Sequence, residues 1–137
     1  MDEKTDKVIK GRVFSGLGRG AYFTQLDWVK QQCLEKLGFI PFAGTLNIRV
    51  SEGYLELVQQ VKAEADIDVV PPSPDFCPAN AIPISIGNIK AAIISPHAEE
   101  FTEEVHSTEV IEVIAPVEIK KALDLKDGDE VVINLEQ

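Results

Sequence analysis

Two short segments constrain this chain more than any other feature of its sequence. The first, GLGRG at 16–20, follows an apolar alternating run at 8–14 that indicates a strand. Three glycines within five residues let the backbone turn tightly and direct several N–H groups at an anion. The second, GTLN at 44–47, opens the next strand pattern, where Thr45 and Asn47 point to the same face. Together the two segments predict a phosphate-binding loop beside a pair of metal ligands.

The residue types of the second segment favour one metal. A hydroxyl and an amide suit Mg²⁺ when substrate phosphates balance most of its charge, which is typical of a kinase. Other nucleotide motifs do not fit, because neither G-x-G-x-x-G opening a helix nor a loop ending in G-K-[ST] occurs. The alternative interpretation is structural: GLGRG is then a hairpin loop, and Thr45 and Asn47 form hydrogen bonds within a buried turn.

Length and composition bound the class of protein. A chain of 137 residues predicts one domain, residues 1–137, in which 1–6 form a charged, flexible tail. No apolar run reaches the roughly twenty residues of a membrane span, and the N-terminus lacks the apolar core of a signal peptide. Two cysteines, Cys33 and Cys77, fit a reducing compartment and lack zinc-site spacing. We expect a cytoplasmic protein with no membrane partner.

Charge is distributed unevenly along the chain. Residues 1–50 contain eight Lys and Arg against five Asp and Glu, whereas residues 51–137 contain five against eighteen. The net charge of −10 disfavours DNA or RNA as a partner, because nucleic-acid affinity depends on basic side chains. A small anionic ligand needs only a local positive site. We therefore expect no nucleic-acid partner, and nothing in the pattern requires an obligate protein partner.

The periodicity predicts a mainly β fold. Strand patterns occupy 7–14, 44–50, 81–86, 89–95, 109–115 and 130–135, and helical patterns occupy 27–37, 52–62 and 118–125. Gly38 is placed to end the first helix, and turns are expected at 87–88 and 126–129, with a proline-rich loop at 71–75. Because no regular βαβ alternation appears, we predict a small β-barrel with peripheral short helices.

Four sequence blocks then carry a family resemblance. They are GLGRGAYF at 16–23, LGFIPFAGTLN at 37–47, EVIEVIAP at 109–116 and LKDGD at 125–129. In this order they resemble the CTP-dependent riboflavin kinase family typical of archaea, over nearly all of residues 7–135. The resemblance implies a six-stranded cradle-loop barrel that transfers the γ-phosphate of CTP to the 5′-hydroxyl of riboflavin, giving FMN and CDP, with Mg²⁺ as cofactor. Some members carry an added N-terminal DNA-binding domain, for which we expect no room in this length.

The resemblance also implies site residues. It places the Mg²⁺ ligands on Thr45 and Asn47, and flavin contacts on Glu112 and Glu104. We take Glu112 as the catalytic candidate, because a carboxylate near the flavin hydroxyl accepts its proton or orients it; otherwise Glu112 is an outward residue of an alternating strand. The implied nucleotide-binding residues are Gly16, Leu17, Gly18, Arg19, Gly20, Ala21, Val117, Glu118, Ile119 and Lys120.

One segment departs from the family pattern and keeps two alternatives open. Family members often carry a basic residue and a threonine shortly before the histidine that matches His106, where this chain has TEEV at 102–105. Six acidic residues and no Lys or Arg lie between 99 and 112. This departure favours the first alternative, a module that binds nucleotide or flavin without turnover. The ending at 123–132 also resembles the swapped-hairpin transcription factors, which bind DNA as dimers.

Overall fold

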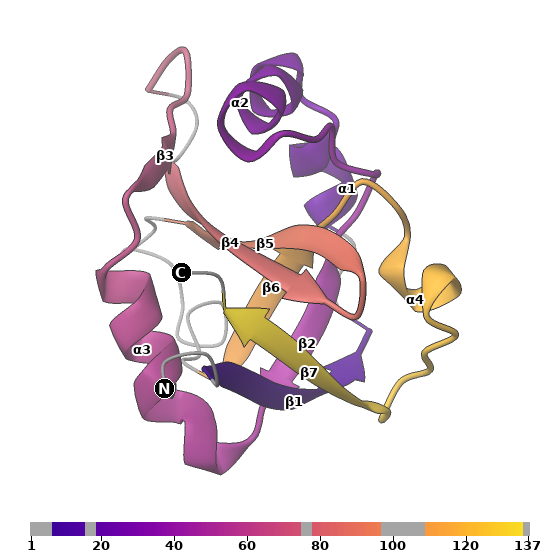
Figure 1. The fold of residues 1–137 in the computed structure, drawn as a ribbon. Helices are drawn as coiled ribbons and strands as arrows, with labels where there is room; N and C mark the ends of the chain where they lie inside the picture. Colours follow the sequence, from indigo (N-terminus) through magenta and orange to yellow (C-terminus); the bar gives the residue numbers. More distant parts are fainter. Residues whose placement is uncertain (1–6, 16–18, 75–77, 97–108, 136–137) are drawn as a thin grey trace.

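The structure is a computed structural model that describes residues 7–15, 19–74, 78–96 and 109–135. Figure 1 shows the arrangement of its elements. In chain order these are β1 (Val8–Phe14), α1 (Arg19–Thr24), α2 (Asp27–Leu37), β2 (Leu46–Val50), the 3₁₀ turn η2 (Glu52–Tyr54), α3 (Leu55–Ala63), β3 (Ile67–Val69), β4 (Ala79–Ile86), β5 (Ile89–Pro96), β6 (Val110–Ile114), α4 (Ile119–Ala122) and β7 (Glu130–Leu135).

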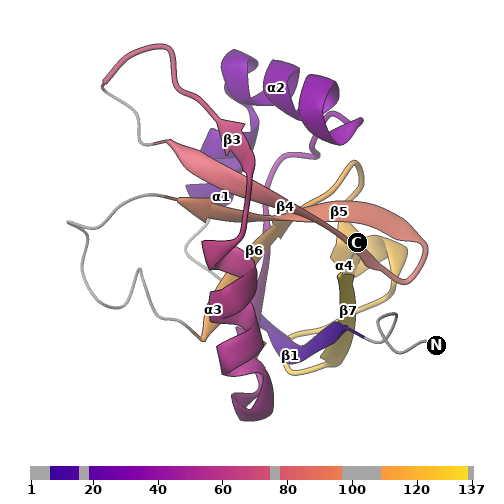
Figure 2. The same ribbon diagram turned by 60° about the vertical axis from the view of Figure 1, so that its left-hand side comes forward.

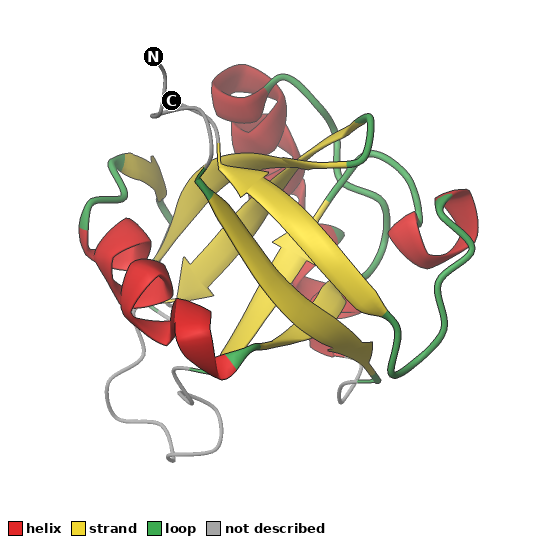
Figure 3. Cartoon of the chain, turned by 60° about the horizontal axis from the view of Figure 1, so that its bottom comes forward, coloured by secondary structure: helices red, strands yellow, loops and turns green. Residues whose placement is uncertain are grey.

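Six of the strands close into an antiparallel barrel. Neighbouring strands follow the order β4-β5-β6-β2-β1-β7, and β7 pairs back with β4 at Ile84↔Leu135 to Ile86↔Ile133. β3 pairs with Ala79–Ala81 at the start of β4 and is not one of the six ring strands. In Figure 3 the strands wrap around a common interior. The six-stranded barrel implied by the resemblance is confirmed, and closure satisfies the backbone groups that an open sheet edge would leave unpaired.

Alternating apolar side chains fill the interior of the barrel. In β7, for example, Val131 and Ile133 are buried while Val132 and Asn134 are exposed. Val58 of α3 and Ile119 of α4 join the same cluster, so both helices are anchored on the barrel core. Each large aliphatic side chain that is fully buried contributes about 1.5–3 kcal/mol of transfer free energy. The interior is therefore a packed core, and the ligand site must lie outside it.

A second apolar layer lies between α2 and the outer face of the sheet. Val29, Cys33 and Leu37 of α2 recur at four-residue spacing and pack onto outward residues of β3 to β6, such as Ala92 and Ile114. Figures 1 and 2 show α2 lying across β4 and β5. The helix begins and ends where the sequence predicts, because Gly38 adopts a left-handed conformation (φ 87°) and its N–H donates to Cys33 O.

Four local features differ from the sequence prediction. α1 begins at Arg19, inside the segment expected to be loop, and the helix expected at 52–62 is divided into η2 and α3. α4 is only Ile119–Ala122, because Asp124 adopts a positive φ of 56° that ends the helical path. β3 was not predicted; three residues carry too little periodicity, and the strand exists through its pairing with β4.

No helix in the described part of the chain is long and apolar enough to cross a membrane.

Candidate functional site

The pairing of β2 with β6 brings together three of the residues singled out in the sequence. Asn47 and Glu112 are direct partners across the two strands, and both point outward because Leu46, Ile48, Ile111 and Val113 point into the core. Thr45 shares this outer face, and its Oγ1 donates a hydrogen bond to Glu112 Oε1 over 3.1 Å. All three side chains are half-buried. The predicted metal pair and the predicted flavin carboxylate are therefore adjacent.

A pocket opens beside Thr45. One wall is the segment 42–46, and the other comprises Val113, Ala115 and the segment 117–120. The first wall is fixed by two hydrogen bonds: Phe42 N–H donates to Ala115 O over 2.7 Å, and Gly44 N–H donates to Thr24 Oγ1 over 2.9 Å. Thr24 is fully buried at the end of α1, and Gly44 has a φ of 121° that favours glycine. The backbone beside Thr45 is thus held in one conformation.

The second wall contains the predicted second nucleotide segment. Ile119 is buried in the barrel core and anchors the segment, whereas Val117 and Glu118 are exposed. Lys120 is half-buried and is the basic residue among those that line the pocket. The structure therefore places 117–120 and Thr45 in the lining of one pocket, although they are far apart in the sequence.

A larger cavity, of about 210 Å³, lies between α3 and β4. Its lining mixes Lys7 with Gln60, Glu64 and Asp66, and contains none of the predicted site residues. The candidate site is therefore the smaller pocket beside Thr45, because the predicted residues line that pocket.

The glycine-rich segment is described only in part. Gly16, Leu17 and Gly18 lie outside the described residues, as does Glu104, so their predicted roles stay predictions. Arg19, Gly20 and Ala21 form the first turn of α1. The prediction of a loop at 16–20 was therefore wrong for Arg19 and Gly20, because the helix begins before the apolar positions on which the sequence pattern depends.

Lys62 of α3 is a charged neighbour that the sequence pattern did not single out. It lies one helical turn after the buried Val58 and is half-buried, so its stem follows the packed face of the helix. Burial lowers the pKa of its ammonium, and the nearby Glu112 carboxylate raises it. A lysine in a helical pattern is ordinarily solvent-exposed, and only the tertiary fold places this one near Glu112.

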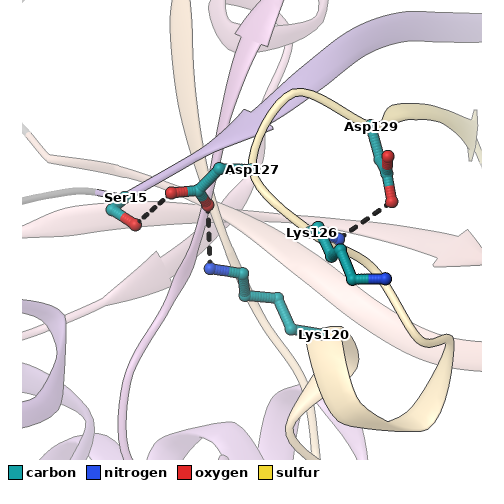
Figure 4. Close-up of polar contacts among 5 residues, drawn as sticks. All are labelled: Ser15, Lys120, Lys126, Asp127 and Asp129. Carbon is teal, nitrogen blue, oxygen red and sulfur yellow. Dashed lines mark hydrogen bonds and ion pairs between the residues drawn. The ribbon is translucent and has the colours of Figure 1, made fainter.

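Asp127 forms a second polar cluster at the end of β1. Ser15 Oγ donates to its Oδ2 over 2.5 Å, and Lys120 Nζ donates to its Oδ1 over 2.9 Å (Figure 4). Two hydrogen bonds lower the pKa of the Asp127 carboxyl; the one from Ser15 has the larger effect, and the one from Lys120 has the next largest. The sequence predicted only a turn here, although the LKDGD block that contains Asp127 was one of the four that carried the resemblance.

Comparison with known proteins identifies the family. A family model named CTP-dep_RFKase, described as "Domain of unknown function DUF120", matches residues 13–135. The chain belongs to this family. The match confirms the resemblance seen in the four sequence blocks, and it covers every residue assigned above to the candidate site.

Similar proteins named riboflavin kinase occur in several archaea. The chain is 35% identical over 129 residues to that of Methanocella arvoryzae, covering 94% of this chain and 57% of that protein. It is 37% identical over 129 residues to that of Pyrobaculum aerophilum, covering 91% and 59%. It is 36% identical over 128 residues to that of Ignicoccus hospitalis, covering 91% and 69%. The chain thus spans a little over half the length of most of these relatives.

Proposed function

We propose that this chain is a riboflavin kinase, which transfers the γ-phosphate of CTP to the 5′-hydroxyl of riboflavin and releases FMN and CDP. Its family and the names of its relatives support the acceptor, and the name of the family supports CTP as donor. The structural observation that carries the proposal is the grouping of Thr45, Asn47 and Glu112 beside the pocket lined by 117–120. Phosphoryl transfer depends mainly on positioning and charge neutralisation, which such a grouping can supply.

The donor set fits Mg²⁺. The hydroxyl of Thr45 donates a hydrogen bond to Glu112, which leaves the lone pairs of Oγ1 available to a cation. Asn47 contributes an amide oxygen on the same face, and neutral oxygen donors suit a metal that also binds phosphates. When bound, Mg²⁺ would neutralise charge on the β- and γ-phosphates. Glu112 would orient Thr45 in this arrangement as well as facing the acceptor.

The pocket beside Thr45 suits the nucleotide. Residues 117–120 line it, and we take their backbone to read the base: a carbonyl oxygen would accept from the exocyclic amine of cytosine, and an N–H group would donate to the ring. Such readout by backbone atoms needs no characteristic side chain. Gly16 to Ala21 remain our proposed phosphate-binding segment, on the strength of their glycines alone.

Glu112 is proposed to act on the acceptor. The 5′-hydroxyl oxygen of riboflavin attacks the γ-phosphorus, the bond from that phosphorus to the β,γ-bridging oxygen breaks, and CDP leaves. The proton of the hydroxyl passes to the Glu112 carboxylate, directly or through water. Glu104 remains a proposed flavin contact, named from the resemblance.

The direct test is an incubation of the purified protein with riboflavin, Mg²⁺ and each of CTP, UTP, GTP and ATP separately, with FMN measured by chromatography. We expect CTP to support the reaction at least about tenfold better than UTP or ATP, because a hydrogen-bonded site rejects an analogue that leaves buried polar groups unpaired. Equal use of ATP would refute the donor assignment. CDP binding without FMN from any triphosphate would instead indicate a binding module.

A further inference from the structure

The turn at 126–129 is fixed to the end of β1. Gly128 N–H donates to Val13 O over 2.7 Å, and Val13 N–H donates to Asp129 O over 3.0 Å. Arg12 Nη1 also donates to Gly128 O over 2.8 Å, and the turn is closed by Asp129 Oδ2, which accepts from Lys126 N–H over 2.9 Å. These contacts hold the backbone of Asp127 beside Ser15, the residue before the glycine-rich segment.

The side chain of Asp127 links two elements that are remote in the sequence. One carboxylate oxygen accepts from Ser15 at the end of β1, and the other accepts from Lys120 of α4 (Figure 4). The ion pair is exposed, with 37% and 51% of the Lys120 and Asp127 side chains accessible to solvent. Exposed pairs of this kind contribute little to stability. The effect of this pair is instead to fix the position of the Lys120 ammonium.

Lys120 lines the pocket beside Thr45 while its ammonium is bound to Asp127. A free lysine side chain samples many rotamers, and ordering it on binding a ligand carries an entropic penalty. A carboxylate that already holds the ammonium reduces this penalty. The same carboxylate holds Ser15, so the pocket wall and the strand end keep a fixed separation.

We propose that Asp127 is a positioning residue for nucleotide binding, which holds Lys120 at the pocket wall and ties it to Ser15. This inference rests on the proposed function, because it takes the pocket to be the nucleotide site. It makes a counterintuitive prediction about charge. If Asp127 acted only through its negative charge, its removal would strengthen the binding of an anion. If it acts by positioning, its removal weakens that binding.

The test uses Asp127→Asn, which keeps the shape and removes the charge, so that the charge-assisted hydrogen bond holding the Lys120 ammonium is replaced by a weaker one to a neutral amide oxygen. The matched control is Asp124→Asn, which makes the same change of net charge at an exposed position of the same connection, where φ is 56° and asparagine is well tolerated. CDP affinity in the presence of Mg²⁺ is measured by calorimetry. The KM values for CTP and riboflavin are measured separately.

We expect Asp127→Asn to bind CDP roughly tenfold more weakly, with an unchanged KM for riboflavin, and Asp124→Asn to match the wild type. In a Lys120→Met background, Asp127→Asn should have a much smaller effect, because Asp127 acts through the lysine. Tighter or unchanged CDP binding by Asp127→Asn overturns the proposal, as does an equal loss in Asp124→Asn.

The two proposals fail in different ways. A wild-type protein that binds CDP but forms no FMN refutes the kinase function, and the CDP affinities still decide the role of Asp127. If the wild-type protein forms FMN and Asp127→Asn has a normal KM for CTP, the kinase function stands and the positioning role of Asp127 is refuted. A wild-type protein that binds no CDP overturns both.

Discussion

Thr45 donates a hydrogen bond to the Glu112 carboxylate over 3.1 Å, and this contact joins the residue before β2 to β6 beside the pocket that Thr45 lines. One residue comes from the predicted metal pair and the other from the predicted flavin contact. Because the hydroxyl donates this hydrogen bond to the carboxylate, the same bond orients both groups. The metal ligands and the acceptor carboxylate therefore behave as one unit, and a change to either is expected to disturb both.

Thr45→Val removes the hydroxyl and keeps the β-branched shape. We expect Mg²⁺-dependent turnover to fall about 100-fold, on the scale of the losses caused by disturbing metal sites. The free energy of unfolding should change by only about 1 kcal/mol, the net value of one hydrogen bond. The measurement is FMN formation across a Mg²⁺ titration, alongside urea unfolding, with Thr45→Ser as the control that keeps the hydroxyl. Full activity in Thr45→Val would remove the metal assignment, and failure to fold would return Thr45 to a structural role.

Thr24→Val tests the support of the pocket wall. Thr24 is fully buried, and its Oγ1 accepts from the backbone N–H of Gly44. Valine leaves that N–H without its acceptor, so we expect a loss of about 1–3 kcal/mol in the free energy of unfolding. CDP affinity should fall as well, because Gly44 precedes Thr45. Thr24→Ser retains the acceptor and is the matched control; equal stability of Thr24→Val and the wild type would show that the contact is unimportant.

Local patterns predicted most of the fold but little of how it assembles. α2 is recognisable because Val29, Cys33 and Leu37 recur every four residues and a glycine follows them. β7 is recognisable because three β-branched residues, Val131, Val132 and Ile133, follow the turn expected at 126–129. β3 carries no such signal, and it forms only because β4 presents a partner. Pattern recognition fails where an element depends on its neighbours.

The candidate site shows the same division. Thr45 and Asn47 could be proposed from their two-residue spacing, which places them on one face of a strand whatever the fold. Glu112 required the family resemblance, because a lone glutamate in an alternating strand is ordinarily an outward residue. Lys62 and Asp127 could not be assigned roles, since each acts on a residue distant in the sequence. Such contacts become visible only when the barrel closes.

Cys33 should be unreactive in the folded protein. Its side chain is fully buried in the layer between α2 and the sheet, and burial raises the pKa of its thiol from 9.0 to about 11. At pH 8 the thiolate fraction is then roughly 100-fold below that of an exposed cysteine. In a Cys77→Ser background, we expect a disulfide reagent to label Cys33 at least 100-fold more slowly in buffer than in urea, roughly in proportion to thiolate. Equal rates in the two solutions would show that the thiol is accessible in the native state.

Lys62→Met tests the environment beside Glu112 through pH. Burial lowers the pKa of the Lys62 ammonium below its ordinary 10.5, with Glu112 opposing the shift. Below the lowered pKa, the lysine is charged in both states and its desolvation disfavours folding. Between that pKa and 10.5 the unfolded chain binds more protons than the folded chain. The free energy of unfolding of the wild type therefore rises with pH in this range. Lys62→Met, which keeps much of the stem, should therefore exceed the wild type in stability near pH 7.

The advantage of Lys62→Met should shrink as the pH approaches 10.5, the unperturbed value, because the wild-type lysine is then increasingly neutral in the folded state. Urea unfolding at intervals between pH 7 and 10.5 measures the difference between the two proteins. Lys121→Met on the exposed side of α4 is the control, and the difference it produces should not vary with pH in this way. A constant difference between Lys62→Met and the wild type would place the Lys62 ammonium in water. A wild type more stable than Lys62→Met at pH 7 would show that attraction to Glu112 outweighs desolvation, which reverses the order of the two causes.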